Sequence, residues 1–157
     1  IGADCRIHES VTIHRGTPQG GGVTRIGDDV MLMNGAHVAH DCQIGAHAII
    51  ASFSGLAGHV EIGAWAVLGA YTGVHQFARV GESCMTAANA KLSKDAPPFA
   101  MVAGGIDAAK LKRWLPEYAV DTIFLLGGSL LGRPDVAAAA SELSALVAGP
   151  VRRRRRT

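Results

Sequence analysis

The sequence is poor in aromatic residues, in cysteine and in long apolar runs. Phe, Trp and Tyr make up 5% of the 157 residues although 48% are hydrophobic, so the core must be built from aliphatic side chains. The three cysteines, Cys5, Cys42 and Cys84, form no CxxC pair and leave one thiol unmatched, which favours a reducing, cytoplasmic compartment. The apolar run at 123–126 is too short to cross a bilayer, and no signal peptide is evident.

The charge is also small and unevenly placed. A formal net charge of +2 is too weak to predict a nucleic-acid partner. Five arginines gather at Arg152 to Arg156, and such a run is usually a solvated tail. Contact with an acidic partner or a membrane surface is the alternative reading of this tail.

A period of six residues runs from Ile26 to Leu92. Every sixth residue is aliphatic except Thr86, and the residue after it is small except at Met33 and His75. This period matches neither an α-helix nor an ordinary strand, and it is typical of a parallel β-helix in which six residues make one short strand and one turn. We therefore expect an all-β parallel β-helix, with the small residue letting the backbone turn tightly.

The β-helix is expected to span residues 1–98. The period already includes Ile1, so we expect further coils before it. The spacing from Ile13 to Ile26 is 13 where two hexads give 12, and this extra residue, together with three glycines, predicts a loop over 14–25. Two prolines at 97 and 98 are expected to end the ladder.

The sequence after the prolines loses the six-residue period and predicts short helices. Residues 99–151 are expected to form a small α-helical C-terminal region, with helices near 108–114, 116–126 and 134–147. The basic tail then occupies 152–157.

Histidines recur at spacings that bring them together. Three hexads make one turn of a three-sided prism, so positions separated by three hexads stack at about 4.8 Å. Asp41 and His59 have this separation and would share one edge on successive coils, with His40 beside them and His75 about one coil further. With His37, these residues predict a histidine cluster over about three coils.

The cluster predicts proton transfer. An imidazole with a pKa near ~6.5 can take a proton at neutral pH, and Asp41 could stabilise the cation formed on His40. Clustered histidines could instead bind zinc. No Glu or Cys completes an obvious ligand set, however, and the i, i+3 spacing of His37 and His40 on a strand sends them to opposite faces. We interpret His8 and His47 as surface residues.

Several motifs resemble one known family. The segments are Glu9 to Gly22, Ala-His-Val-Ala-His-Asp-Cys at 36–42, Leu-Ala-Gly-His at 56–59, Val-His-Gln-Phe at 74–77 and Asp-Ala-Pro-Pro-Phe at 95–99. Together they closely resemble the UDP-N-acetylglucosamine acyltransferases over roughly residues 1–105. The resemblance implies a left-handed β-helix and a homotrimer with active sites between subunits. It also implies transfer of an (R)-3-hydroxyacyl group from acyl carrier protein to the sugar 3-hydroxyl, the first step of lipid A biosynthesis, without a metal or organic cofactor.

The same resemblance implies residue roles. His40 matches the general base and Asp41 its electrostatic partner. The residues that match substrate contacts in the cleft are His37, His59, His75, Gln76 and Arg113. Ala88 falls where the family sets acyl length, and its small size implies room for a medium or long chain. The segment 101–113 is shorter than in the family and lacks the expected Asn and Glu.

Other readings stay open at this point. The chain could be an inactive trimeric remnant of such an enzyme with a structural role, or a hexapeptide-repeat zinc enzyme. Basic residues near the end of the β-helix could form a docking patch for acyl carrier protein, namely Lys91, Lys94, Lys110, Lys112 and Arg113.

Overall fold

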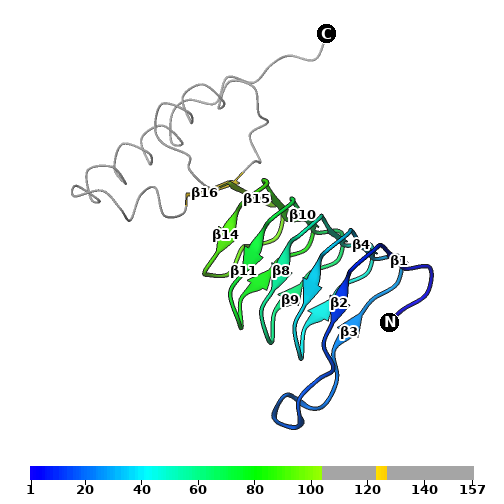
Figure 1. Ribbon diagram of the computed structural model, residues 1–157. Helices are drawn as coiled ribbons and strands as arrows, with labels where there is room; N and C mark the ends of the chain where they lie inside the picture. Colours follow the sequence, from blue (N-terminus) through cyan, green and yellow to red (C-terminus); the bar gives the residue numbers. More distant parts are fainter. Residues whose placement is uncertain (104–122, 127–157) are drawn as a thin grey trace, which may run out of the picture.

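The computed structural model describes residues 1–103 and 123–126, and in it the chain winds into a three-sided parallel β-helix (Figure 1). Three parallel sheets form its sides. Sheet A contains β1 (Arg6–Ile7), β4 (Met31–Leu32), β7 (Ile49–Ile50), β10 (Val67–Leu68), β13 (Met85–Thr86), β15 (Ala100–Ala103) and β16 (Ile123–Leu126). Sheet B contains β2 (Thr12–Ile13), β5 (His37–Val38), β8 (Gly55–Leu56), β11 (Gly73–Val74) and β14 (Lys91–Leu92). Sheet C contains β3 (Arg25–Ile26), β6 (Gln43–Ile44), β9 (Glu61–Ile62) and β12 (Arg79–Val80).

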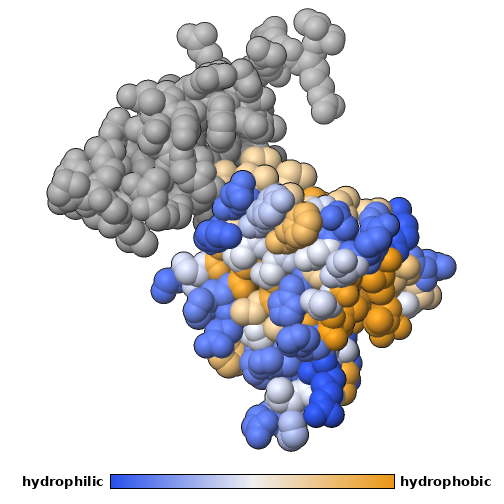
Figure 2. Space-filling model, viewed as in Figure 1, coloured by the Kyte–Doolittle hydropathy of each residue, from blue (hydrophilic) through white to orange (hydrophobic). Residues whose placement is uncertain are grey.

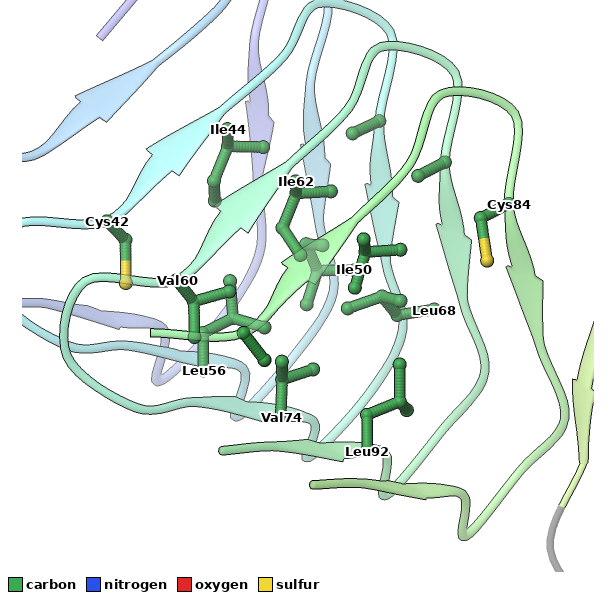
Figure 3. Packing of buried hydrophobic residues seen from close by; sticks show 14 of the residues in the cluster. Cys42, Ile44, Ile50, Leu56, Val60, Ile62, Leu68, Val74, Cys84 and Leu92 are labelled. Carbon is green, nitrogen blue, oxygen red and sulfur yellow. The ribbon is translucent and has the colours of Figure 1, made fainter. Parts of the chain in front are cut away.

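The hexad anchors fill the prism, as the six-residue period predicted. Each strand from β3 to β12 buries one aliphatic side chain in the prism, and Ile44, Ile50 and Leu56 form one such layer (Figure 3). Strands three hexads apart pair in register, for example Val38 with Leu56. Thr86, the one anchor that is not aliphatic, is buried and hydrogen-bonds through Oγ1 to the hydroxyl of Thr72 at 2.8 Å. A buried hydroxyl therefore has its partner, and the core tolerates it.

The turns differ from the expected ones in one respect. From Ile26 to Thr86, the left-handed backbone conformation falls three residues after each anchor rather than directly after it, at residues that include Asp41, His59 and Phe77. The residue directly after the anchor is small for a different reason, which is the closeness of the next coil. A Cβ added at Gly45, for example, would lie 2.5 Å from the backbone nitrogen of Ala64 on that coil. Close stacking of coils, and not backbone φ, demands the small side chain there.

The insertion after β2 is longer than the single extra residue predicted from the sequence. β2 and β3 lie on adjacent sides of the prism, so Ile13 and Ile26 are one hexad step apart rather than two. Their spacing of 13 therefore holds seven extra residues and not one. This insertion loop, residues 14–24, includes a 3-10 turn η1 (Pro18–Gly20) and protrudes from the β-helix with a hydrophilic surface (Figures 1 and 2).

Sheet A continues past the two prolines, contrary to expectation. Pro97 and Pro98 lie in the turn before β15, where a missing N–H breaks no ladder, and β15 pairs with β13 in parallel. β16 pairs with β15, so residues 123–126 form a strand and not the end of the expected helix at 116–126. The sequence Ile-Phe-Leu-Leu is compatible with a strand as well as with a helix. The other expected helices and the arginine tail lie outside the described residues. Within the described residues, no helix has the length and apolar character that a membrane span requires.

Candidate active site

The site is built on the edge between sheets B and C. Each turn from sheet B to sheet C exposes one short run of side chains, and the coils stack these runs in register. His40 and Asp41 follow β5, and His59 follows β8 on the next coil. The backbone N–H of His59 donates to the carbonyl oxygen of His40 at 3.0 Å. The predicted sharing of one edge by Asp41 and His59 is thereby confirmed.

Asp41 is the centre of this group. Its side chain is 2% exposed, and its Oδ2 lies 2.8 Å from His40 Nδ1 and 3.7 Å from His59 Nε2. Thr17 of the insertion loop donates to the same carboxylate twice, from Oγ1 to Oδ2 at 2.7 Å and from its backbone N–H to Oδ1 at 2.9 Å. The backbone N–H of Asp41 donates to Thr24 Oγ1 at 2.9 Å. The carboxylate is therefore held from both sides.

These contacts keep Asp41 ionised. Burial by itself raises the pKa of Asp41, but hydrogen bonds from the Thr17 side chain, from His40 and from the Thr17 backbone, together with the charge of His59, outweigh it and lower the pKa to about 2. An ionised carboxylate only accepts hydrogen bonds, so His40 must donate from Nδ1. In the neutral ring, Nε2 of His40 then carries the free lone pair.

Two further residues shape the surroundings of these rings. A Cβ added at Gly58 would lie 2.5 Å from His40 Cε1 and 2.7 Å from Nε2, so the ring lies directly over this glycine. Phe77, one coil beyond His59, stacks on it with centroids 4.6 Å apart and ring planes 10° from parallel. Neither residue was assigned to the site from the sequence, although the spacing of three hexads between His59 and Phe77 contains the signal.

His37 and His75 belong to a neighbouring hollow on sheet B. Both line it, together with Gly55, Gly73 and Lys91. His37 Nδ1 lies 2.7 Å from Thr12 Oγ1. Burial and the nearby charge of His14 lower the pKa of His37. The structure therefore separates the expected cluster into two groups, because His37 lies on a strand while His40 lies in the turn.

The remaining predicted site residues are dispersed. Gln76 is exposed on the same edge as His59, and its carbonyl oxygen lies 3.1 Å from His75 Nδ1. Ala88 is exposed in the turn between β13 and β14, on the edge between sheets A and B. Arg113 lies outside the described residues. A second hollow, lined by His14, Arg15, Thr17 and His40 among others, opens between the insertion loop and the edge that carries His40.

The central group could also hold a metal ion. Ligand atoms of His40, Asp41 and His59 lie within 4.8 Å of one another, and among the residues that the structure describes they form the one such group. Asp41 supplies the third ligand atom beside the two histidines, and the sequence analysis had not considered it as a metal ligand. The 2.8 Å separation of His40 Nδ1 and Asp41 Oδ2 is a hydrogen-bond distance, so in the metal-free site the Nδ1–H of His40 donates to Asp41 Oδ2.

The sequence is similar to those of hexapeptide-repeat acyltransferases. The family model "Bacterial transferase hexapeptide (six repeats)" matches residues 24–58. An acyl-[acyl-carrier-protein]–UDP-N-acetylglucosamine O-acyltransferase of Paracoccus denitrificans is 45% identical over 119 residues, which are 72% of this chain and 46% of the relative. The protein of that name in Campylobacter concisus is 51% identical over 104 residues, which are 66% of this chain and 40% of the relative.

Solved structures agree with these relatives. The UDP-N-acetylglucosamine acyltransferase of Campylobacter jejuni matches with a TM-score of 0.64 and 48% identity, covering 64% of this chain and 40% of that one. The enzyme of Francisella novicida matches with a TM-score of 0.65 and 41% identity, covering 71% and 44%. The shared fold is the left-handed parallel β-helix. This chain spans less than half the length of the curated relatives it matches.

Proposed function

Because the β-helix of this chain is homologous to that of the UDP-N-acetylglucosamine acyltransferases, we propose that the chain supplies the catalytic β-helix of such an enzyme. The reaction moves an (R)-3-hydroxyacyl group from acyl carrier protein to the 3-hydroxyl of UDP-N-acetylglucosamine, the first step of lipid A biosynthesis. Acyl carrier protein and a nucleotide sugar are cytoplasmic substrates, and we place the protein in that compartment.

The observation that carries the proposal is the geometry of His40 and Asp41. A sugar hydroxyl is a poor nucleophile at neutral pH, so a base must take its proton as the oxygen attacks the thioester carbonyl. His40 Nε2 carries a free lone pair for this proton, and Asp41, 2.8 Å from Nδ1, stabilises the imidazolium. The tetrahedral intermediate then collapses to the ester, and the imidazolium returns the proton to the departing thiolate. No covalent acyl-enzyme is needed.

His59 and Phe77 support this charge balance. His59 Nε2 lies 3.7 Å from the same Asp41 oxygen, so both histidines compete for one carboxylate. This contact places His59 against the carboxylate that stabilises the imidazolium of His40. The stacking of Phe77 holds the His59 ring in place. We assign His59 to substrate contact and to the positioning of Asp41.

The substrate contacts are proposed by position. The hollow on sheet B offers His37 and His75 beside backbone and aliphatic surface, which suits a ligand with polar and apolar parts. Gln76 extends the edge toward the next coil. Ala88 lies on a different edge of the prism from His40. We propose that an acyl chain bound along the face of the prism reaches Ala88, and that this residue limits the length of the chain. Arg113 stays a proposed phosphate contact.

A homotrimer would complete the site. The outward side chains of sheet A are apolar over five successive coils, namely Met31, Ile49, Val67, Met85 and Met101. Those of sheet C are polar, and two of them, Arg79 and Glu61, form an exposed ion pair at 3.4 Å. We infer from this flat apolar face beside a polar one that sheet A packs against other copies. Active sites between subunits would then draw on two chains.

The proposal is tested by assaying the purified chain with 3-hydroxyacyl-acyl carrier protein and UDP-N-acetylglucosamine, with product identified by mass spectrometry. We expect transfer in the wild type and its loss in His40→Ala. A folded wild type without transfer would favour the inactive remnant.

The zinc alternative rests on the three ligand atoms of His40, Asp41 and His59. It predicts stoichiometric zinc by elemental analysis of protein purified without chelators, and loss of that zinc in His59→Ala. Acyl transfer that is unaffected by a chelator would eliminate it.

A further inference from the structure

The insertion loop adds nothing to the core of the β-helix. The other turns from sheet B to sheet C connect their strands without seven extra residues, and η1 has no buried residue. The loop is nevertheless internally fixed. The carbonyl oxygen of Thr17 accepts the N–H groups of Gly20 at 3.0 Å and Gly22 at 2.7 Å. A Cβ added at Gly16 would lie 2.0 Å from the backbone nitrogen of Val23, so the two ends of the loop are in tight contact.

The fixed part of the loop is directed at one carboxylate. Thr17 Oγ1 accepts the N–H of Gly20 at 3.1 Å and donates its own proton to Asp41 Oδ2 at 2.7 Å, while its backbone N–H donates to Oδ1 at 2.9 Å. Gly20 covers the same group, since a Cβ there would lie 2.2 Å from Asp41 Cγ. Only glycine lets the backbone approach the carboxylate this closely.

We propose that Thr17 is a positioning residue of the acyl transfer, acting through Asp41 on His40. A carboxylate with one bonded partner can rotate about its Cβ–Cγ bond. Two donors from Thr17, one on each oxygen, fix that rotation and leave the Oδ2 lone pair aimed at His40 Nδ1. The imidazole is thereby held in one tautomer and one orientation. The inference rests on the proposed function, and it gives the insertion loop the role of orienting the base.

The test uses a conservative pair of variants on the whole chain. Thr17→Val keeps the β-branched shape and the backbone N–H but removes the hydroxyl, and Thr17→Ser restores it. Thr12→Val is the matched control, because it removes the hydroxyl at His37 Nδ1 and none at Asp41. The carboxyl ¹³C resonance of Asp41 and the imidazole ¹⁵N resonances of His40 are followed as a function of pH.

We expect the pKa of Asp41 to rise from about 2 toward 3.8 in Thr17→Val and to stay low in Thr17→Ser and Thr12→Val. The value of kcat should fall about 10- to 100-fold in Thr17→Val, the factor that one hydrogen bond to a charged group is worth, with KM little changed and activity recovered in Thr17→Ser. A pKa of Asp41 and a kcat in Thr17→Val that both equal the wild-type values would overturn the proposal.

The two inferences fail separately. A wild type without acyl transfer contradicts the proposed function, whereas the NMR titration still reports whether Thr17 controls Asp41 and His40. A rise in the Asp41 pKa with unchanged His40 tautomer and unchanged kcat also overturns the positioning role, because the contact would then be structural only.

Discussion

Gly58→Ala should disable the site without removing any chemical group from it. The new Cβ would lie 2.5 Å from His40 Cε1 and 2.7 Å from Nε2. Carbon contacts are comfortable at about 3.5–4.0 Å, so the imidazole must move by about 1 Å. The ring can move because the His40 side chain is 41% exposed, whereas Asp41 is 2% exposed and cannot follow. A misplacement of about 1 Å costs on the order of 10²-fold in rate, and we expect kcat to fall by that factor.

The fold should survive this change. Gly58 is absent from the positions with positive φ, so the backbone accepts alanine without strain there. The assay is kcat for acyl transfer, with the melting temperature and the His40 imidazole resonances as companions. Gly55→Ala on the same coil is the control, because its Cβ meets no atom within 4 Å and should leave the His40 resonances and the melting temperature unchanged. Full activity and an unshifted His40 resonance in Gly58→Ala would refute the reasoning.

Five further outcomes are expected. Asp41→Asn should lower kcat less than His40→Ala, which should cost about 10²–10⁴-fold. Because the pKa of Asp41 is depressed to about 2, its contribution to stability is present above the ordinary value of 3.8 and is lost as pH falls through 2; acid unfolding monitored by circular dichroism should show this loss in the wild type and not in Asp41→Asn. Leu56→Ala should lower the free energy of unfolding by about 2–5 kcal/mol in urea titrations, and a loss below that of Leu56→Met would contradict the core assignment. Ile49→Lys should dissociate the proposed trimer in sedimentation velocity, while Gln43→Lys on sheet C should not. Burial raises the pKa of the Cys84 thiol to about 11, so iodoacetamide should leave Cys84 unmodified in the native protein and label it in urea.

The periodic part of the structure could be predicted from the sequence. A period of six fixes which side chains point inward, and three hexads per coil place Asp41 against His59. The same arithmetic could have added Phe77, which lies one full coil beyond His59 and stacks on it. The repeat therefore contains both the core and the columns of side chains on the edges.

The parts of the structure that depart from the repeat could not be predicted from the six-residue period. Counting residues between Ile13 and Ile26 does not say how many sides of the prism the chain passes, so the seven-residue insertion was taken for one extra residue. Thr17 occupies no periodic position, and its contact with Asp41 depends on how the loop folds back. The strand at 123–126 was read as helix because short apolar runs suit both states, and pairing with β15 decides between them.

The three-sided coil imposes a rule on how this chain can change in length. Each edge of the prism recurs once per three hexads, so the deletion of a single hexad between Asp41 and His59 would rotate everything after it by one side. His59 would then leave the edge of Asp41 although every strand could still pair and every anchor could still be buried. The deletion of three consecutive hexads, a whole coil, would preserve both the core and the edges. The insertion loop is exempt from this rule, because its length does not enter the coil register. The length of the loop is instead limited by its contacts with Asp41, whereas the coils can gain or lose length without disturbing the site only by whole turns.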